Sequence, residues 1–543
     1  MLGEVAVAVL ALLIIAAGAV LAPKVGVAAP LVLVLVGIGV SLAPVLEDFE
    51  VDPEWILQGL LPPLLYAAAV SMPAMNFRRE FRAISGLSVL LVIASALVLG
   101  LLFAWLIPGI GFVWGAALGA IISPTDAVAT SIIKATPVPN RVIVILEGES
   151  LLNDATALVL LRTAIVATTA GFSFWAALGT FAYAVAVAVV IGAFVGRLNL
   201  AVRRRVEDPT VNTILSFTVP FLASVPAEAA GSSGLVAAVV AGLVTGYHAP
   251  RRLSPQHRLS DSQNWASVEL MLEGLVFLLM GLELSTILAE VPREHTGLGI
   301  ALAIACAALV ATLLTRAAYV TPLLWGLGRR RRRGERIQPR VAEMHEKLQA
   351  GELPEFRRGP GRGEYKRRDI ERLTTHVRRM LADIDYLRSQ PLRAKDGAIV
   401  VWAGMRGAVT VAAAQTLPAE TPHRPLLLFV AFAVATLSLL VQGGTVGPLV
   451  ARLFRNEPEE PRTPEEDTQQ RQVLALLEDV MNQTPHEEGA SEKQYRLSVL
   501  TAQRNALLDA RDDGAYDADV LAHALRNVDA TQIALELRGG PDG

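Results

Sequence analysis

The sequence predicts an all-α polytopic membrane protein with about thirteen transmembrane helices and a small helical region outside the membrane. Hydrophobic residues make up 53% of its 543 residues and charged residues only 18%. Soluble domains are typically about 45–50% apolar and about 25% charged. The apolar residues also gather in blocks close to the roughly 20 residues that a helix needs to cross a bilayer. This balance argues against a soluble enzyme.

Thirteen apolar stretches, each bounded by charged residues, proline or glycine, are the predicted membrane helices. They cover residues 5–22, 27–44, 55–72, 84–107, 112–133, 141–169, 173–198, 210–227, 233–248, 264–288, 297–325, 396–417 and 424–452. The one cysteine, Cys306, lies inside the eleventh stretch. The sequence therefore predicts neither a disulfide framework nor a cysteine-based metal site.

Basic residues are distributed unevenly between alternate loops. If the N-terminus lies outside the cell, thirteen Lys and Arg residues fall in the short inside loops, and two, Arg293 and Arg424, fall outside. Cytoplasmic loops of membrane proteins carry an excess of Lys and Arg. We therefore expect a multi-pass protein of the cell membrane whose N-terminus is outside and whose C-terminus is cytoplasmic.

Two segments are too polar for the membrane, and they differ in charge. Residues 328–395 hold 20 basic and 10 acidic residues, whereas residues 456–543 hold 8 basic and 19 acidic residues. Either each is a solvated face, with an arginine run held against anionic lipid, or the tail docks on the loop. The expected organisation is 1–327 with transmembrane helices 1–11, 328–395 as a basic cytoplasmic loop, 396–455 with helices 12 and 13, and 456–543 as an acidic cytoplasmic region.

The fifth predicted helix ends in the sequence Ser-Pro-Thr-Asp-Ala-Val-Ala, residues 123–129. Pro124 removes a hydrogen bond from the helix, so Thr125 and Asp126 would face backbone groups without helical partners. Broken backbone at membrane depth occurs where it is buried in protein or lines a cavity. The alternative is a kinked packing helix with Asp126 near its cytoplasmic end.

The sixth predicted helix carries a dense set of polar residues. On a helix, Ser150 and Asp154 are one turn apart, and so are Glu149 and Asn153. Hydroxyl, amide and carboxylate oxygens therefore converge on one wall of the helix, and hard cations prefer oxygen ligands. The alternative is a polar network that only locks helices together.

Two arginines lie in later membrane helices. Gly404 and Gly407 flank Arg406 and favour an unwound segment, so we interpret Arg406 as a charge-balancing residue of the core. Arg316 is either another such residue or an anchor that extends to the membrane surface. The fifth and twelfth helices are the interrupted middle members of two helix triplets, which is typical of inverted repeats with a transport site between them.

These motifs, residues 123–129, Glu149-Ser-Leu-Leu-Asn153-Asp154 and Gly404-Met-Arg406-Gly407-Ala408, resemble those of the sodium/proton exchangers, the first family of monovalent cation:proton antiporters. The resemblance implies the sodium/proton antiporter fold, a mobile core bundle and a homodimer. It implies that Asp154 carries Na⁺ and H⁺ in turn, with Ser150, Glu149 and the Thr125 backbone around the ion. It places Asp126 beside the ion, with Asn153, Arg406 and, by position only, Arg316 as supporting residues.

The Asn153-Asp154 pair resembles the electroneutral members of that family, because one carboxylate that swaps one proton for one Na⁺ moves no net charge. The resemblance also implies a bacterial branch with a cytoplasmic tail, and 42 Arg against 6 Lys fit such a genome. We expect no cofactor besides the transported Na⁺ and H⁺, with K⁺ or Li⁺ as other cargo. The expected partners are membrane lipid and a second copy of the chain, but no nucleic acid.

Other uses of the same residues stay open. Asp126 and Asp154 are also compatible with an intramembrane carboxylate hydrolase, and the polar helices with an uncoupled cation channel or sensor. Glu269 and Glu273 in the tenth helix either line a second ion path or pair with loop arginines. Glu283, later in that helix, we interpret as a packing or dimer-side residue.

Overall fold

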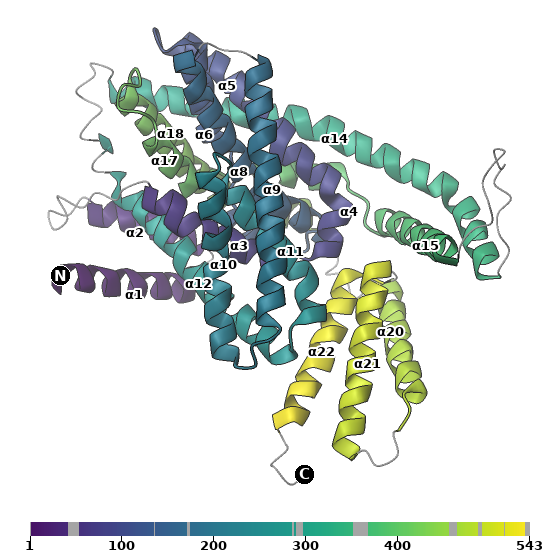
Figure 1. Ribbon diagram of the computed structural model, residues 1–543. Coiled ribbons are helices and arrows are strands. Elements are labelled where there is room, and N and C mark those ends of the chain that lie inside the picture. Colours follow the sequence, from purple (N-terminus) through teal and green to yellow (C-terminus); the bar gives the residue numbers. More distant parts are fainter. Residues whose placement is uncertain are drawn as a thin grey trace. The chain divides into compact units, whose positions relative to one another are not determined.

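The computed structural model of the protein (Figure 1) describes residues 2–25, 27–41, 54–134, 136–170, 174–284, 287–288, 297–350, 367–455, 464–486, 491–514 and 516–537. Contacts divide the chain into two compact units. The membrane unit is Met1–Ala249, His257–Thr321 and Ala394–Asn456, and the extramembrane unit is Pro250–Gln256, Pro322–Arg393 and Glu457–Gly543. All regular elements in the described ranges are helices, which confirms the predicted all-α class.

The membrane unit contains the apolar helices. They are α1 (Leu2–Val25), α2 (Ala29–Ser41), η1 (Trp55–Leu60), α3 (Leu61–Ser71), α4 (Ala74–Ser85), η2 (Gly86–Leu91), α5 (Val92–Leu106), α6 (Gly111–Ile122), α7 (Val128–Ile133), α8 (Asn140–Ala170), α9 (Phe174–Arg203), α10 (Pro209–Ala229), α11 (Gly234–Arg252), α12 (Pro255–Leu282), α16 (Ala394–Trp402), α17 (Ala408–Gln415), α18 (Arg424–Ser438), η4 (Leu439–Gly443) and α19 (Gly444–Leu453). The elements η1, η2 and η4 are π-helical turns. The 52-residue helix α14 (Leu298–Gln349) contributes to both units, and so do the last residues of α11 and the first residues of α12.

Seven helices in the described ranges are long and apolar enough to cross a membrane. They are Ala74–Leu106, Asn140–Thr168, Leu178–Arg203, Pro209–Ala229, Pro255–Leu282, Leu298–Leu348 and Arg424–Leu453. Four shorter apolar helices, Ala6–Ala22, Ala29–Ser41, Trp55–Ser71 and Gly111–Ile122, accompany them. The polytopic class is confirmed, while the count of thirteen spans stays a prediction.

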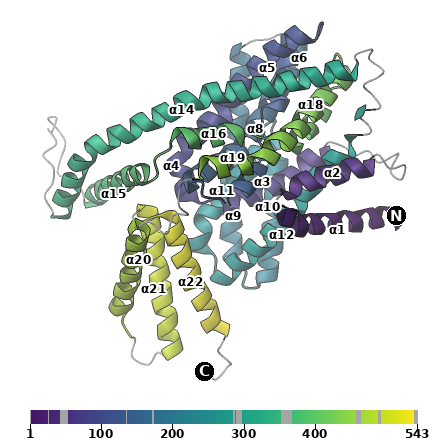
Figure 2. The ribbon, with the colours of Figure 1, turned by 180° about the vertical axis from the view of Figure 1, so that it is seen from behind.

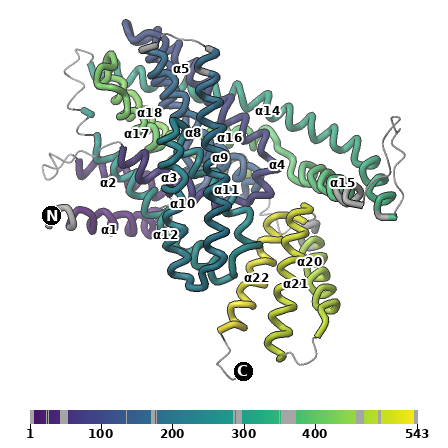
Figure 3. The backbone as a smooth tube through the Cα atoms, in the orientation of Figure 1, coloured from purple at the N-terminus to yellow at the C-terminus, as the bar shows by residue number. Residues whose placement is uncertain are grey.

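Both predicted interruptions are present. The fifth predicted helix divides into α6 and α7 around Pro124, and the twelfth divides into α16 and α17 around Arg406. Figure 3 traces α17 beside α18, which returns antiparallel to it after a short turn. Gly407 is needed at the second interruption because a Cβ there would overlap the Asp126 carboxylate oxygen Oδ2. The two interruptions therefore meet at a place that admits no side chain on residue 407.

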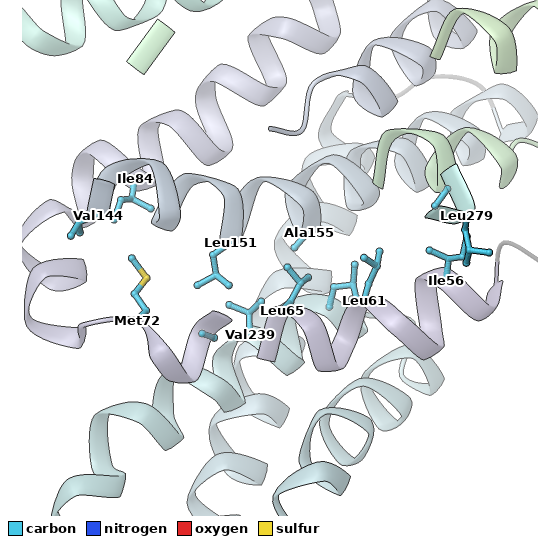
Figure 4. Close-up of a cluster of buried hydrophobic side chains, with 13 residues drawn as sticks. Ile56, Leu61, Leu65, Met72, Ile84, Val144, Leu151, Ala155, Val239 and Leu279 are labelled. Atoms are coloured by element: carbon cyan, nitrogen blue, oxygen red, sulfur yellow. The ribbon is translucent and has the colours of Figure 1, made fainter. Parts of the chain in front are cut away.

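An apolar cluster holds α8 in place (Figure 4). Leu61 and Leu65 of α3, Leu151 and Ala155 of α8, and Val239 of α11 pack together in it. Leu151 and Ala155 each follow a polar residue, Ser150 or Asp154, in the sequence. Since successive helical residues point about 100° apart, packing on α3 and α11 fixes which direction the polar face of α8 takes.

The extramembrane unit is built from polar helices, which include α15 (Arg367–Ser389), α20 (Pro464–Gln483), α21 (Glu492–Asp513) and α22 (Ala518–Leu537). The last three pack side by side (Figure 2) around Val473, Leu507 and Leu521. A capping box of Ser491 and Gln494 begins α21, and it satisfies backbone donors that the first helical turn leaves free. The predicted helical tail is thus a three-helix bundle.

Candidate ion-binding site

The two interruptions are joined by their backbones. The backbone N–H of Asp126 donates to the carbonyl oxygen of Met405 at 2.7 Å. The Asp126 carboxylate then turns back and accepts from the Val128 N–H at 3.0 Å, which begins the short helix α7. A buried N–H without a partner is costly. These two hydrogen bonds satisfy the N–H groups of Asp126 and Val128, so the two broken helices can meet inside the membrane unit.

Arginine side chains satisfy carbonyl oxygens that the interruptions expose. Arg406 Nε donates to the Ile122 carbonyl at the end of α6, at 3.0 Å, and its Nη1 donates to Gly404 O. Arg316 Nε donates to the Val400 carbonyl in α16 at 2.8 Å. A helix that ends in the membrane leaves its last carbonyls free, and a guanidinium with five donors and a positive charge compensates them well.

The helix pair α18 and η4 completes this compensation. The Ser438 hydroxyl accepts from the Arg406 N–H at 3.0 Å and donates to Gln442, whose amide donates to the Trp402 carbonyl at 2.8 Å. Both Ser438 and Gln442 are fully buried. Neither residue belongs to a motif that the sequence alone marks as functional. A lone glutamine in an otherwise apolar stretch was the available signal.

Glu149 and Arg316 form a buried ion pair. Their side chains are 2% and 1% exposed, and the guanidinium donates to both carboxylate oxygens, to Oε2 at 2.7 Å. Arg316 therefore lies inside the unit rather than extending to a membrane surface, while its supporting role at the ion site stays a prediction. A paired, hydrogen-bonded geometry is what a buried charge requires.

Thr125 and Asn153 extend this pair into a network. The Thr125 hydroxyl donates to Glu149 Oε1 at 3.2 Å and accepts from Asn153 Nδ2 at 2.6 Å. The same Nδ2 also approaches the Thr125 carbonyl at 3.3 Å. The structure thus brings together four residues, Thr125, Glu149, Asn153 and Arg316. Through Asn153, helix α8 binds the segment between α6 and α7 that contains Thr125.

Asp154 is left outside this network. It is 7% exposed, and within the described ranges its carboxylate has neither a hydrogen-bond donor nor an ion-pair partner. Ser150, one turn before it on α8, likewise makes no side-chain hydrogen bond in those ranges. Asp126 is close enough for its charge to act on Asp154. Two oxygen groups on one face of α8 are therefore free to accept a ligand, and their roles in ion binding stay predictions.

The sequence and the fold of the chain match known proteins. The profile described as "Sodium/hydrogen exchanger, transmembrane" matches residues 8–351 and 372–452. The chain belongs to the sodium/hydrogen exchanger family.

Two relatives within the sodium/hydrogen exchanger family illustrate the similarity. The uncharacterized Na(+)/H(+) exchanger Rv2287 of Mycobacterium tuberculosis is 28% identical over 566 aligned positions, which cover 95% of this chain and 94% of the relative. The Na(+)/H(+) antiporter NhaP of Pseudomonas aeruginosa is 28% identical over 421 positions, 75% of this chain and 82% of the relative.

A solved structure supports the fold of this sodium/hydrogen exchanger family member. The sodium proton antiporter MjNhaP1 of Methanocaldococcus jannaschii superimposes with a TM-score of 0.58 at 15% identity, over 83% of this chain and 99% of that chain. The predicted sodium/proton antiporter fold is therefore confirmed.

Proposed function

We propose that this chain is a secondary transporter that exchanges a monovalent cation, Na⁺ with K⁺ and Li⁺ as other cargo, for H⁺ across the membrane. Membership of the sodium/hydrogen exchanger family supports this function. It also supports a transporter rather than an enzyme, and it supports neither the hydrolase nor the uncoupled channel.

The observation that carries the proposal is the state of Asp154. Arg316 is bound to Glu149, so Asp154 is buried and has no counter-ion in the part of the chain that the structure describes. A carboxylate in a poorly solvated place must be neutralised, and either a proton or a cation can do this. The two cannot bind together, because each removes the charge that attracts the other. Competition for one carboxylate couples the two ions.

The neighbouring oxygens are suited to an alkali cation. We assign Na⁺ to the Asp154 carboxylate, the Ser150 hydroxyl and the Thr125 carbonyl, with Asp126 adding negative charge nearby. Glu149, which the motif places around the ion, acts on this reading by fixing Thr125 and Arg316 rather than by ligation. One Na⁺ for one H⁺ on a single carboxylate makes the exchange electroneutral.

The topology and assembly follow the sequence. The excess of basic residues in alternate loops supports an external N-terminus and a cytoplasmic C-terminus in a bacterial plasma membrane. A homodimer with a mobile core bundle is the expected assembly of this fold, and transport would proceed by alternating access.

The acidic tail is proposed to dock on the basic loop and to modulate transport. Within the extramembrane unit, Arg379 Nε donates to the Asp512 carbonyl at 2.9 Å, and Arg378 pairs with Asp513. Arg251 donates to Asp509 at 2.7 Å and to Asp512 at 2.8 Å. These contacts support the docking. A chain truncated after residue 456 that keeps both the rate and the pH profile of exchange would contradict the modulating role.

The test of the function is cation-dependent proton flux in proteoliposomes that contain the purified full-length chain. Na⁺, K⁺ or Li⁺ added to one side should each be tried for release of internal protons, and an imposed membrane potential should not drive flux. Asp154→Asn should abolish exchange while expression is retained, and Asp208→Asn, at an exposed carboxylate outside the spans, serves as the matched control. Coupled flux that persists in Asp154→Asn would refute the assignment.

A further inference from the structure

One stripe of helix α8 packs on the neighbouring helices α3 and α11 through apolar side chains. Leu151 and Ala155 belong to the buried cluster that also contains Leu61 of α3 and Val239 of α11, and Leu158 packs against the same cluster. Spacings of four and three residues place Leu151, Ala155 and Leu158 on one face of the helix. We call this stripe, residues 151, 155 and 158, the seam of α8.

Polar contacts join α8 to a different set of elements. Glu149 binds Arg316 of α14, and Asn153 binds Thr125 at the first interruption. The Ser88 hydroxyl of η2 donates to the Glu149 carbonyl at 3.1 Å, and both residues are buried. Because buried hydrogen bonds are costly to break, these contacts make α8 move together with α14, η2 and the first interruption.

Helices α9, α10 and α11 form a second closely packed group. A Cβ on Gly192 or Gly196 of α9 would overlap the carbonyl oxygens of Ala237 and Ala241 of α11, respectively. Ala223 of α10 lies with these two alanines in one buried cluster. Close backbone contact leaves little room for these helices to shift against one another. The seam is therefore the boundary between this group and the group that carries the ion site.

An ion pair crosses this boundary at one end of the seam. Arg162 follows Leu158 by four residues, and its Nη1 donates to Glu228 Oε2, near the end of α10, at 2.8 Å. The other carboxylate oxygen accepts from the N–H of Gly234, the first residue of α11, at 3.0 Å. Negative charge is favourable at the start of a helix. A Cβ on Gly234 would lie 2.9 Å from Glu228 Cγ, so glycine lets this carboxylate settle there, and Arg162 meets a fixed partner.

The ion pair lies beyond Asp154 along α8. Asp154 is one turn before Leu158, and Arg162 is eight residues, about 12 Å, further from the start of α8. In the proposed topology this end of α8 faces outside. An ion that reaches Asp154 from outside along the seam must therefore pass Leu158 and the ion pair.

We propose that Arg162 and Glu228 form a latch that holds the outer end of the seam closed, and that it opens when Asp154 becomes accessible from outside. The inference rests on the proposed exchange, because alternating access requires one helix group to move against the other. The two side chains are 56% and 30% exposed, and partly exposed pairs are weak. The latch can therefore open in every cycle. Arg162 and Glu228 act on the position of α8 and do not contact the cation.

The test is the rate at which a maleimide labels a cysteine beneath the latch. The parent for this test is the purified full-length chain with Leu158→Cys and with Cys306→Ala, which removes the native thiol. Arg162→Gln should raise the labelling rate about three- to fivefold, the upper range for a partly exposed pair. Loss of a nearby positive charge alone would slow labelling by reducing the thiolate fraction, so a faster rate reports opening of the seam.

Two variants sharpen the test. Glu228→Gln keeps an oxygen for the Gly234 N–H but loses the charge, so it should give the same increase as Arg162→Gln. The double variant should label no faster than either single variant, because the two side chains act as one pair. The matched control is Tyr183→Phe, which removes a 3.1 Å bond to the Ala230 carbonyl within the second helix group and should leave the rate unchanged.

Salt gives a second readout. Raised ionic strength screens exposed charges, so it should speed labelling of the parent toward the Arg162→Gln rate and leave that variant unaffected. Unchanged labelling in folded Arg162→Gln and Glu228→Gln proteins, or increases that add in the double variant, would overturn the proposal. If Arg162→Gln does not fold, the comparison with Glu228→Gln has the same force.

Transport kinetics separate the latch from damage to the ion site. In proteoliposomes, Arg162→Gln should shift the apparent cation constants on the two sides in opposite directions, because it changes the balance between two orientations of one site. Constants that move in the same direction would contradict the latch. Labelling requires no transport. A parent without cation-dependent flux would therefore refute the exchange function, whereas unchanged labelling would refute the latch.

Discussion

The buried pair of Arg316 and Glu149 should respond very differently to single and double substitution. Arg316→Met removes donors from both Glu149 oxygens and from the Val400 carbonyl. It leaves a carboxylate that is 2% exposed with the Thr125 hydroxyl as its remaining donor in the described ranges. Breaking a buried pair in this way typically costs about 3–5 kcal/mol, because an uncompensated charge stays in the interior.

The double variant Arg316→Met with Glu149→Gln removes both charges and keeps an oxygen that accepts from Thr125. Replacing both members of a buried pair is often close to neutral, so we expect the double variant to lie within about 2 kcal/mol of the parent. The matched control is Arg496→Met, because its pair with Glu492 has side chains 63% and 67% exposed. Exposed pairs contribute at most about 1 kcal/mol.

Thermal unfolding of the purified protein in one detergent measures these effects. At about 2 °C per kcal/mol for a large domain, Arg316→Met should lower the midpoint by roughly 6–10 °C. The double variant should recover most of that loss. If the double variant instead falls by the sum of the two single variants, the side chains are not coupled in the folded protein. Glu149 would then be available as an ion ligand, and the role given to it above would be wrong.

Three further outcomes are expected. Gly407→Ala should abolish monodisperse protein in size-exclusion chromatography because its Cβ would overlap Asp126, whereas Gly444→Ala, at a glycine with nothing within 4 Å, should elute like the parent. Ser150→Ala should raise the apparent Na⁺ constant more than it lowers the maximal rate; an unaltered constant would remove Ser150 from the ion. Backbone N–H groups of Val211 and Thr210, at 3.1 and 2.7 Å, hold the pKa of Asp208 below its usual value, so this cap contributes stability above the unfolded-state pKa and loses it as pH falls through the folded-state pKa. Asp208→Asn keeps a capping side chain that does not titrate, and its unfolding midpoint should fall less on acidification than that of the parent; equal falls would contradict the cap.

The interruptions of the membrane helices were predictable because their causes are local. Pro124 has no N–H to donate within a helix, and glycine at 407 lets another segment of the same chain come close. Both breaks could therefore be placed from short motifs. The polar face of α8 was predictable for the same reason, since Ser150 and Asp154 are separated by one helical turn. Local geometry fixes these features before tertiary packing acts.

The choice of partners was not predictable. Glu149 and Arg316 are 167 residues apart, and nothing in either motif states which carboxylate the guanidinium takes. The motif alone would place Glu149 and Asp154 equally near an ion. In the folded chain the guanidinium on α14 binds Glu149, and Asp154 has no ion-pair partner among the described residues. Likewise, Ser438 and Gln442 acquire their role only when η4 lies beside the second interruption.

The bond from Asp126 N–H to Met405 O is made by main-chain atoms, so a substitution at either position, other than proline at 126, keeps its donor and its acceptor. Substitutions of nearby side chains, such as the Ser150 hydroxyl or the Asp154 carboxylate, can alter which ion is preferred without breaking this bond between the two helix interruptions. Selectivity and mechanical integrity are thereby separable in this protein. Single mutations could therefore change the preferred cation during evolution while the two helix interruptions stay joined.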